Sequence, residues 1–303
     1  MRENMAPAME DVASRSTEHG PEDYGKNVHM TLTFMRHEEP GKTPDGMSAD
    51  YLTETGKLNA AVRGFNLDAG IKKLFSSPKK RAKQTVDIMG QNAYSDVEIM
   101  NKTFEQAETE RPEGEKENKF NVREVPELDT APNIGPLWKE AAAHAKELIK
   151  GGDKHREIDL TLQYILEHPD RAKELGAPST EEIAAPLAYR VAYEAQMSDK
   201  LLNNSDVELI HGTHGPKLEP FIREVIVNKA GEPGFKHVDE IGGAFDPGEG
   251  FGIELRRNDK DSPDNPNNYE LELKVRGMSF KVDVTRLLEP AKKYLASRGE
   301  KAK

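Results

Sequence analysis

The chain has no cysteine among its 303 residues. Disulfide bonds, thiolate zinc sites, iron–sulfur clusters and a cysteine nucleophile are therefore excluded. It also lacks any apolar run near the roughly 18 residues that a membrane-spanning helix requires. The first 27 residues are polar, carry charges of both signs and contain no apolar segment of the kind found in a secretion signal. We therefore expect a disordered leader over residues 1–27 and a cytoplasmic protein.

Positive charge is scarce relative to negative charge. There are 43 Lys and Arg residues against 54 Asp and Glu residues, which gives a net charge of −11, and the mean hydropathy is −0.77. An acidic chain is a poor partner for nucleic acid and for anionic membranes, so we expect neither. An anionic substrate would need a local pocket of positive charge. A hydrophobic content of 35% still allows a sizeable core.

Strands and helices are expected to alternate through the first hundred residues. Met30, Leu32 and Phe34 alternate with threonines, which is the period of a strand. Thr53 is suited to cap a helix whose apolar face carries four residues, Leu58, Ala61, Val62 and Phe65. The expected elements are strands at 29–36, 71–77 and 97–100, with helices after Thr53 and at 79–89. This order is typical of a largely parallel sheet.

The remainder of the chain predicts an insertion and a late set of strands. Residues 101–124 are polar and without period, and residues 138–202 are mainly helical, with a capping box at Ser179 and Glu182. The later expected elements are a strand at 207–213, a helix at 216–227, strands at 252–255, 271–275 and 280–284, and a helix at 286–297. Arg276 and Gly277 fit a tight hairpin turn between the last two strands.

The fold class predicted from these elements is α/β. We expect a three-layer sandwich whose mostly parallel central sheet is flanked by helices, with antiparallel strands towards the C-terminus. Residues 28–303 then form one domain, with an insertion at about 101–206 and a β-rich extension at about 229–285.

Three separated segments place polar groups at the carboxyl end of a strand or at the start of the next helix. They are Arg36-His37, the segment 76–85 with the sequence SSPKKRAKQT, and Thr213-His214-Gly215. Ligands of open α/β sheets bind beyond the carboxyl ends of the strands. A phosphoryl group favours guanidinium donors, helix N-terminal amides and a nearby nucleophile. The pattern therefore favours phosphate chemistry, with Arg36 and Arg81 as cations and His37 as a nucleophile.

These segments resemble the histidine phosphatase superfamily, which includes cofactor-dependent phosphoglycerate mutase. Four of its motifs are matched in order: Arg-His-Gly by Arg36-His37, Leu-Thr-x-x-Gly by 52–56, Ser-Ser-Pro-x-x-Arg-Ala-x-Gln-Thr by 76–85, and Ser/Thr-His-Gly by 213–215. The resemblance covers about residues 29–90 and 205–228. It implies a phosphatase rather than a mutase, because the extension that the mutase branch carries after Arg-His-Gly is absent here.

The resemblance implies a mechanism without a metal or another cofactor. His37 attacks phosphorus and becomes phosphorylated, while Arg36, Arg81 and His214 hold the phosphoryl oxygens. A carboxyl group protonates the leaving oxygen and then activates the water that cleaves phosphohistidine. The implied substrate is a phosphorylated small molecule, and the sequence indicates no particular oligomeric state.

Two positions depart from the family pattern. Glu38 replaces the glycine of Arg-His-Gly, so a carboxylate either orients a base or repels the substrate. The family's acid follows a leucine by two residues, and Thr130 stands there instead, flanked by Glu127 and Asp129. We slightly prefer Glu127 as the general acid, and Asp129 stays open.

Two other functions remain as alternatives. The first is a metal centre formed by five residues, His37, Glu38, Glu39, His211 and His214, although no His-Glu-x-x-His spacing supports it. The second is a catalytically weak or inactive phosphate-binding member, which the replacement of glycine by Glu38 favours. His211, two residues before Thr213, is more simply a packed histidine.

Overall fold

The computed structural model describes residues 23–43, 48–99, 122–149, 153–228, 230–257 and 269–299. The strands are β1 Val28–Arg36, β2 Pro40–Lys42, β3 Ser48–Leu52, β4 Gly70–Ser76, β5 Val97–Ile99, β6 Arg123–Glu124, β7 Asp206–Thr213, β8 Ile226–Val227, β9 Gly250–Arg257, β10 Tyr269–Val275 and β11 Met278–Val282. The α-helices are α2 Glu54–Phe65, α3 Lys80–Gln91, α5 Gly135–Leu148, α6 Lys154–Glu167, α7 Pro169–Glu174, α8 Thr180–Met197, α9 Gly215–Val225 and α10 Val284–Ser297. Short 3₁₀ turns include η2 Pro126–Leu128 and η4 Val238–Ile241.

A mixed sheet forms the middle layer. In the described residues its strand order is β5-β4-β7-β1-β9-β10-β11-β8, and β6 also pairs with β4. Strands β1, β4, β5, β6 and β7 are parallel, whereas β8 to β11 join in antiparallel fashion. The α/β class is confirmed, and the three late strands extend the sheet from β1.

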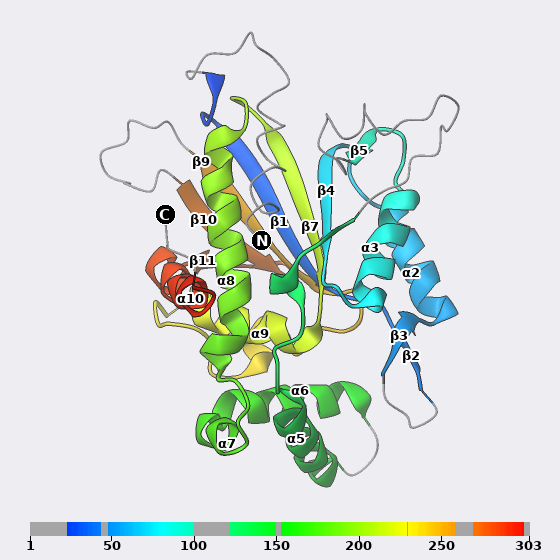
Figure 1. The fold of residues 1–303 in the computed structure, drawn as a ribbon, viewed down its shortest axis with the longest axis vertical. Coiled ribbons are helices and arrows are strands. Elements are labelled where there is room, and N and C mark those ends of the chain that lie inside the picture. The colour runs from blue at the N-terminus through cyan, green and yellow to red at the C-terminus, as the bar shows by residue number, and fades with distance from the viewer. Residues whose placement is uncertain are drawn as a thin grey trace.

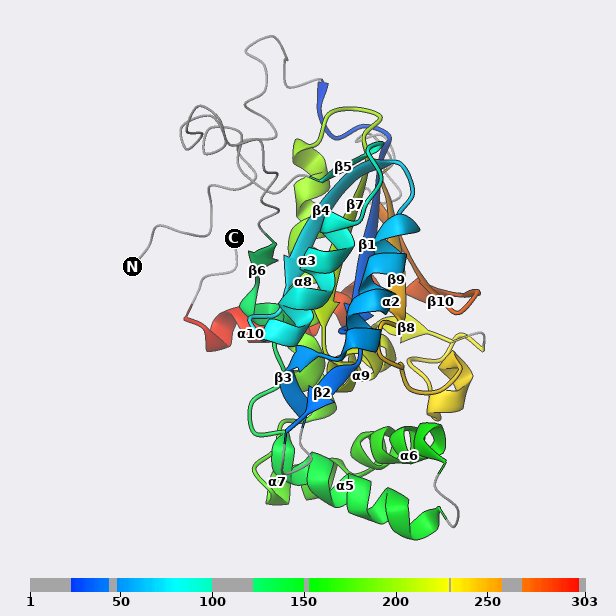
Figure 2. The same cartoon turned by 90° about the vertical axis from the view of Figure 1, so that its right-hand side faces the viewer.

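Helices cover both faces of this sheet, as Figures 1 and 2 show. Helices α8, α9 and α10 pack on one face, over the largest hydrophobic cluster, where Phe34 of β1 stacks on Phe251 of β9. Helices α2 and α3 pack on the other face, over β4 and β7. Helices α5, α6 and α7 lie beyond the carboxyl ends of β1 and β7 (Figure 1). Among the described residues, no helix combines the length and apolar character needed to cross a membrane.

The capping signals are confirmed. Thr53 caps α2 by accepting a hydrogen bond from the Gly56 amide, and Ser179 and Glu182 form the predicted capping box of α8. The hairpin turn has positive φ at both Arg276 (48°) and Gly277 (74°), as a tight two-residue turn requires.

The predicted apolar face of α2 is wrong. Leu58, Val62 and Phe65 are 64%, 47% and 46% exposed, and the helix instead buries Gly56, Ala60 and Gly64. A Cβ on Gly64 would overlap the carbonyl oxygen of Met89 in α3. The two helices therefore approach through small residues, and close backbone packing decides which face of α2 is buried.

The described residues include the end of the predicted leader, residues 23–27. Gly25 donates a backbone hydrogen bond to Leu201, and the Lys26 amide donates to the Asn203 side chain. Residues 23–27 are thus attached to the turn before β7, while residues 1–22 lie outside the described part of the chain. The first part of the predicted insertion, residues 101–121, lies outside it as well.

Candidate active site

His37 and His214 meet because β1 and β7 are parallel neighbours. Arg36 lies opposite Thr213 in the register, and the His37 amide donates a 2.9 Å hydrogen bond to the Thr213 carbonyl. The two residues that follow these strands therefore leave the sheet at the same edge. The ring centroids of His37 and His214 are 5.2 Å apart, with an angle of 66° between the rings. The predicted meeting of the two imidazoles is present in the structure.

The segment 76–85 reaches the same edge through β4. Strand β4 is parallel to β7, and the Ser77 amide donates to the Gly212 carbonyl. The Ser77 hydroxyl lies 2.8 Å from Nε2 of His214. Helix α3 then places Arg81 in its first turn, where Nε donates a 2.9 Å hydrogen bond to Nε2 of His37. His37, His214 and Arg81, three of the predicted site residues, are thus brought near each other.

Glycine 212 explains how α3 comes so close. A Cβ there would lie 2.5 Å from a methyl carbon of Val86 and 3.1 Å from the carbonyl oxygen of Ala82. Only a residue without a side chain lets α3 lie directly on β7. This contact fixes the helix that carries Arg81.

The hydrogen bonds of His37 define which ring nitrogen carries the proton. Nδ1 lies 2.7 Å from the backbone carbonyl oxygen of Glu38, which can only accept, so Nδ1 carries the hydrogen. Nε2 accepts from Arg81, so it presents its lone pair. Burial lowers the pKa of His37 to about 3, and the neighbouring cations Arg81 and Arg36 contribute in the same direction. The imidazole is therefore neutral at physiological pH, as a nucleophile must be.

His214 is a second neutral imidazole. It is 2% exposed, and burial lowers its pKa well below the ordinary value, helped by His37 and Arg81. Its Nδ1 is buried and has no hydrogen-bond partner among the described residues. A buried polar atom without a partner is costly, and it marks a place where a ligand atom would be accommodated.

Arg36 supplies a buried guanidinium to the same place. Its Nη1 donates a 2.7 Å hydrogen bond to the Phe245 carbonyl, while its Nε is buried and, within the described ranges, unpartnered. A Cβ on Gly215 would lie 3.2 Å from Arg36 Nε, so the glycine of the Thr-His-Gly motif leaves room for this side chain. The unpartnered atoms of Arg36 and His214 and the cation Arg81 together form a site suited to an anion.

The structure separates the two candidate acids. The Glu127 carboxylate is bound by Arg298 of the segment after α10, with the Tyr294 hydroxyl 3.5 Å away. Asp129 instead lies 3.8 Å from Nε2 of His214, and its carboxylate raises the pKa of Arg81 against the effect of burial. These contacts favour Asp129 over Glu127 as the candidate acid, because Arg298 occupies the Glu127 carboxylate while Asp129 lies beside His214.

Two residues of this region were missed in the sequence. Lys217 is buried and donates a 2.6 Å hydrogen bond to the Glu127 carbonyl, and burial lowers its pKa to about 7. It follows His214 by one turn of α9, which was the available signal. Arg298 reaches Glu127 from 171 positions away, and no local pattern indicates that pairing.

Glu38 is not a free carboxylate beside His37. Its side chain is fully buried, and its Oε1 accepts a 2.5 Å hydrogen bond from Nε of Arg63 in α2. His211 is likewise outside the site. It is stacked between Phe34 and Phe75, and its Nε2 lies 2.9 Å from Glu194, so it is a packed core histidine. The described residues include no group of three or more His, Asp or Glu side chains that could hold a metal ion.

Comparison with known proteins gives structural matches only. No family model matches the sequence, and no curated protein shows significant sequence similarity. Three solved structures illustrate the matches. Phosphoglycerate mutase from Bacillus anthracis is 14% identical, with a TM-score of 0.43, over 88% of this chain and 98% of that one. The protein histidine phosphatase SixA complexed with tungstate is 12% identical, with a TM-score of 0.29, over 83% and 97%.

The third match is mycobacterial glucosyl-3-phosphoglycerate phosphatase, 14% identical with a TM-score of 0.33, over 81% of this chain and 97% of that one. These proteins are members of the histidine phosphatase superfamily. It is the superfamily that the motifs resemble. Identities and TM-scores this low do not bear on activity or substrate, so the function proposed below rests on the residues of this chain.

Proposed function

We propose that this protein is a phosphatase of the histidine phosphatase superfamily. It is a phosphomonoester hydrolase that works without a metal, through a phosphohistidine at His37, on a phosphorylated small molecule. The observation that carries the proposal is the lone pair of His37 Nε2, held on a neutral ring beside Arg81 and His214. A nucleophile, two guanidinium groups and an unpartnered imidazole nitrogen around one site fit a phosphoryl group.

The first step transfers the phosphoryl group to the enzyme. His37 Nε2 attacks phosphorus, a bond from Nε2 to phosphorus forms, and the bond from phosphorus to the leaving oxygen breaks. The Nδ1 hydrogen stays on the ring, and the Glu38 carbonyl that accepts it stabilises the positive charge that develops there. Arg81 Nε, no longer bonded to the lone pair, is free to donate to a phosphoryl oxygen.

The second step returns the enzyme to its starting state. Asp129 donates its proton to the leaving oxygen in the first step, and its carboxylate then takes a proton from water in the second. The oxygen of that water attacks phosphorus, the Nε2–phosphorus bond breaks, and inorganic phosphate leaves. Arg36, Arg81 and His214 hold the phosphoryl oxygens through both steps, so the two guanidinium groups take the role that a metal ion would otherwise have.

The experiment is hydrolysis of a generic aryl phosphate by the purified protein, with His37→Ala as its control. We expect turnover by the wild type, none by His37→Ala, and full activity after treatment with a chelator. Rapid quenching with a phosphorus-labelled substrate should place the label on His37. A label on serine, or turnover by His37→Ala equal to the wild type, would refute the proposal. A panel of phosphorylated metabolites then identifies the substrate class.

The second candidate function is an inactive phosphate-binding or regulatory module. The buried carboxylate of Glu38 directly after His37 favours it, although the bond with Arg63 offsets its charge. This module is indicated if neither wild type nor His37→Ala turns over any phosphomonoester while the wild type still binds inorganic phosphate. A phosphoglycerate mutase is less favoured, because its extension after Arg-His-Gly is absent. Transfer of phosphate between positions of phosphoglycerate would reveal it.

A further inference from the structure

We propose that Arg63 is a positioning residue for the nucleophile, acting through Glu38. Arg63 holds the Glu38 carboxylate, and this bond fixes the peptide whose carbonyl orients the His37 ring. The inference rests on the proposed phosphatase function and adds to it a residue outside the matched motifs. Among the described residues Arg63 bonds to Glu38 and not to His37, Arg81 or His214, so its effect on the reaction is indirect.

The segment from Arg36 to Glu38 is held by contacts from several elements. The Gly248 amide, just before β9, donates to the carbonyls of both Arg36 (3.1 Å) and His37 (3.2 Å). The Glu38 amide donates a 3.0 Å hydrogen bond to the Thr85 hydroxyl in α3. The Glu38 carbonyl is left to accept from His37 Nδ1. The Glu38 side chain supplies the remaining anchor, and its only partner among the described residues is Arg63.

A carboxylate this deeply buried needs its cation. Glu38 is 0% exposed, its Oε2 has no hydrogen-bond partner in the described part of the chain, and Arg63 is its ion-pair partner there. Removing one partner of a buried ion pair leaves an uncompensated charge, which the structure relieves by moving that charge towards water. Moving Glu38 also moves its own carbonyl, and with it the hydrogen bond that sets the His37 ring.

The fold reserves space for this ion pair. Gly248 has φ of +79°, and a Cβ there would overlap Glu38 Oε1 and lie 2.5 Å from Arg63 Nη2. Only glycine combines that backbone conformation with that free space. The first turn of helix α2 lies against Glu39, the residue after Glu38, because a Cβ on Gly56 would be 2.6 Å from the Glu39 carbonyl oxygen. Helix α2 thus approaches residues 38 and 39 at two points along its length.

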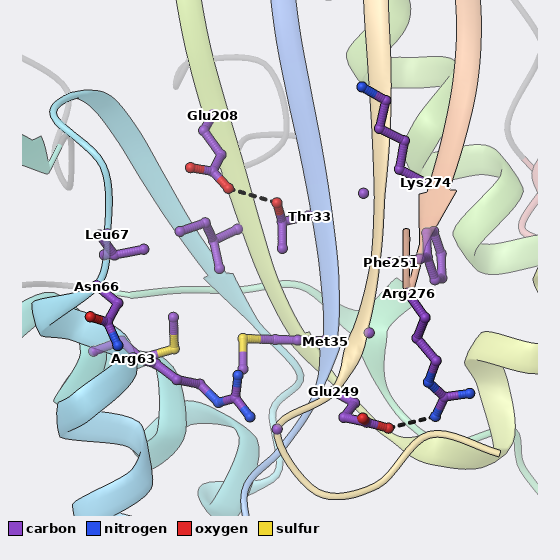
Figure 3. A pocket seen from close by; sticks show the side chains of 15 residues that line it. Thr33, Met35, Arg63, Asn66, Leu67, Glu208, Glu249, Phe251, Lys274 and Arg276 are labelled. Carbon is purple, nitrogen blue, oxygen red and sulfur yellow. Dashed lines mark hydrogen bonds and ion pairs between the residues drawn. The ribbon is translucent and has the colours of Figure 1, made fainter. Parts of the chain in front are cut away.

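Solvent reaches part of the Arg63 side chain. It lines a cavity of about 430 Å³ on the α2 face of the sheet, whose wall includes Met35, Ile210 and Glu249. Figure 3 shows the Arg63 side chain extending from α2 towards Met35. The Arg63 side chain is 41% exposed, whereas that of Glu38 is 0% exposed. A small planar cation can therefore enter the space of a truncated Arg63 and pair with Glu38.

The test is chemical rescue of Arg63→Ala, measured on aryl phosphate hydrolysis. We expect kcat to fall between about tenfold and about a hundredfold through misplacement of His37, with KM changed less than about twofold. Guanidinium chloride, far below denaturing concentrations, should restore most of kcat, whereas tetramethylammonium chloride at equal ionic strength should not. Arg171→Ala is the matched control, because Arg171 is also 41% exposed and paired with a glutamate, Glu140, at 2.7 Å. The Arg171→Ala variant should keep full activity, and guanidinium should not change its kcat.

A second variant covers the case in which Arg63→Ala folds poorly. In Arg63→Ala combined with Glu38→Gln, the buried charge is gone, so we expect folding and part of kcat to return without guanidinium. The Nδ1 hydrogen of His37, observed by NMR, gives a readout that does not need turnover. Its resonance should be lost or shifted in Arg63→Ala and restored by guanidinium.

Outcomes for the two proposals are separable. A wild type without turnover overturns the proposed function, while the Nδ1 resonance still decides the role of Arg63. An Arg63→Ala protein that keeps both its kcat and the wild-type resonance overturns the positioning role. So does a loss of kcat that neither guanidinium nor the added Glu38→Gln reverses.

Discussion

Replacing His37 with glutamine should make the protein more resistant to acid unfolding. Burial lowers the pKa of His37 to about 3 in the folded protein, with Arg81 and Arg36 acting in the same direction. In the unfolded chain the imidazole has its ordinary pKa of about 6.5. Below that pH the unfolded chain binds a proton that the folded protein excludes. Stability supplied by the neutral ring is therefore present above about pH 6.5 and is lost as the pH falls towards about 3.

The size of the effect follows from these two pKa values. Each pH unit between them costs about 1.4 kcal/mol of unfolding free energy, so going from about pH 7.5 to about pH 4.5 costs about 2.7 kcal/mol through His37 alone. Glutamine does not titrate, so His37→Gln should lose about that much less stability than the wild type over the same interval. His214, whose pKa is lowered partly by His37, shifts the comparison in the same direction.

The assay is urea unfolding followed by circular dichroism at both pH values, in buffer without phosphate or other multivalent anions. His155→Gln is the control, because that side chain is 77% exposed, and it should keep the wild-type difference between the two pH values. If the wild type and His37→Gln lose the same stability within about 0.5 kcal/mol, His37 takes up its proton in the folded state. That result would remove the neutral nucleophile on which the proposed mechanism depends.

Further outcomes follow from the same geometry. Asp129→Asn should lower kcat by between about a hundredfold and about ten-thousandfold for an alkyl phosphate and less for an aryl phosphate, whose leaving oxygen needs less protonation. Glu127→Gln should lower it much less, and equal losses in steady-state assays would contradict the choice of Asp129. Gly248→Ala should lower the unfolding free energy by more than about 1 kcal/mol in urea titrations, because it strains φ and overlaps Glu38. Single-turnover rates should not fall through protonation of His37 at any pH above about 4, since its pKa is about 3; a fall centred near about pH 6.5 would contradict this.

The parts of the site that were predictable from the sequence are those that follow strands. Arg36, Ser77 and Thr213 stand at the ends of parallel neighbours, so the pattern of the strands alone brings their segments to one edge. The short motifs could be recognised in the sequence because they lie where a buried strand ends or the next helix starts. The late strands were also predictable as strands, since their alternation is regular, and the position of Arg276 and Gly277 set their hairpin.

Pairings between distant residues were not predictable in this way. The Glu127 carboxylate looked free beside Asp129 because its partner Arg298 lies at the other end of the chain. The apolar stripe of α2 suggested a buried face. Gly64 instead lies against the backbone carbonyl of Met89 in α3, an approach that a larger residue at position 64 would prevent. Hydrophobic periodicity measures how apolar a face is, whereas burial here is decided by how closely two backbones can pack.

Glu38 shows what a departure from a motif requires. Read alone, a carboxylate in place of glycine after His37 predicts either that it orients a base or that it repels the substrate and lowers activity. In the structure, two other positions accommodate this carboxylate: Arg63 supplies the opposite charge, and Gly248 supplies the space that the pair occupies. Because the three residues lie on the segment after β1, on α2 and before β9, the compensation is tertiary and has no signature in any single segment. Experiments should therefore vary Glu38, Arg63 and Gly248 together. Changing Glu38 to glycine alone would leave Arg63 without this partner and the space beside Gly248 empty.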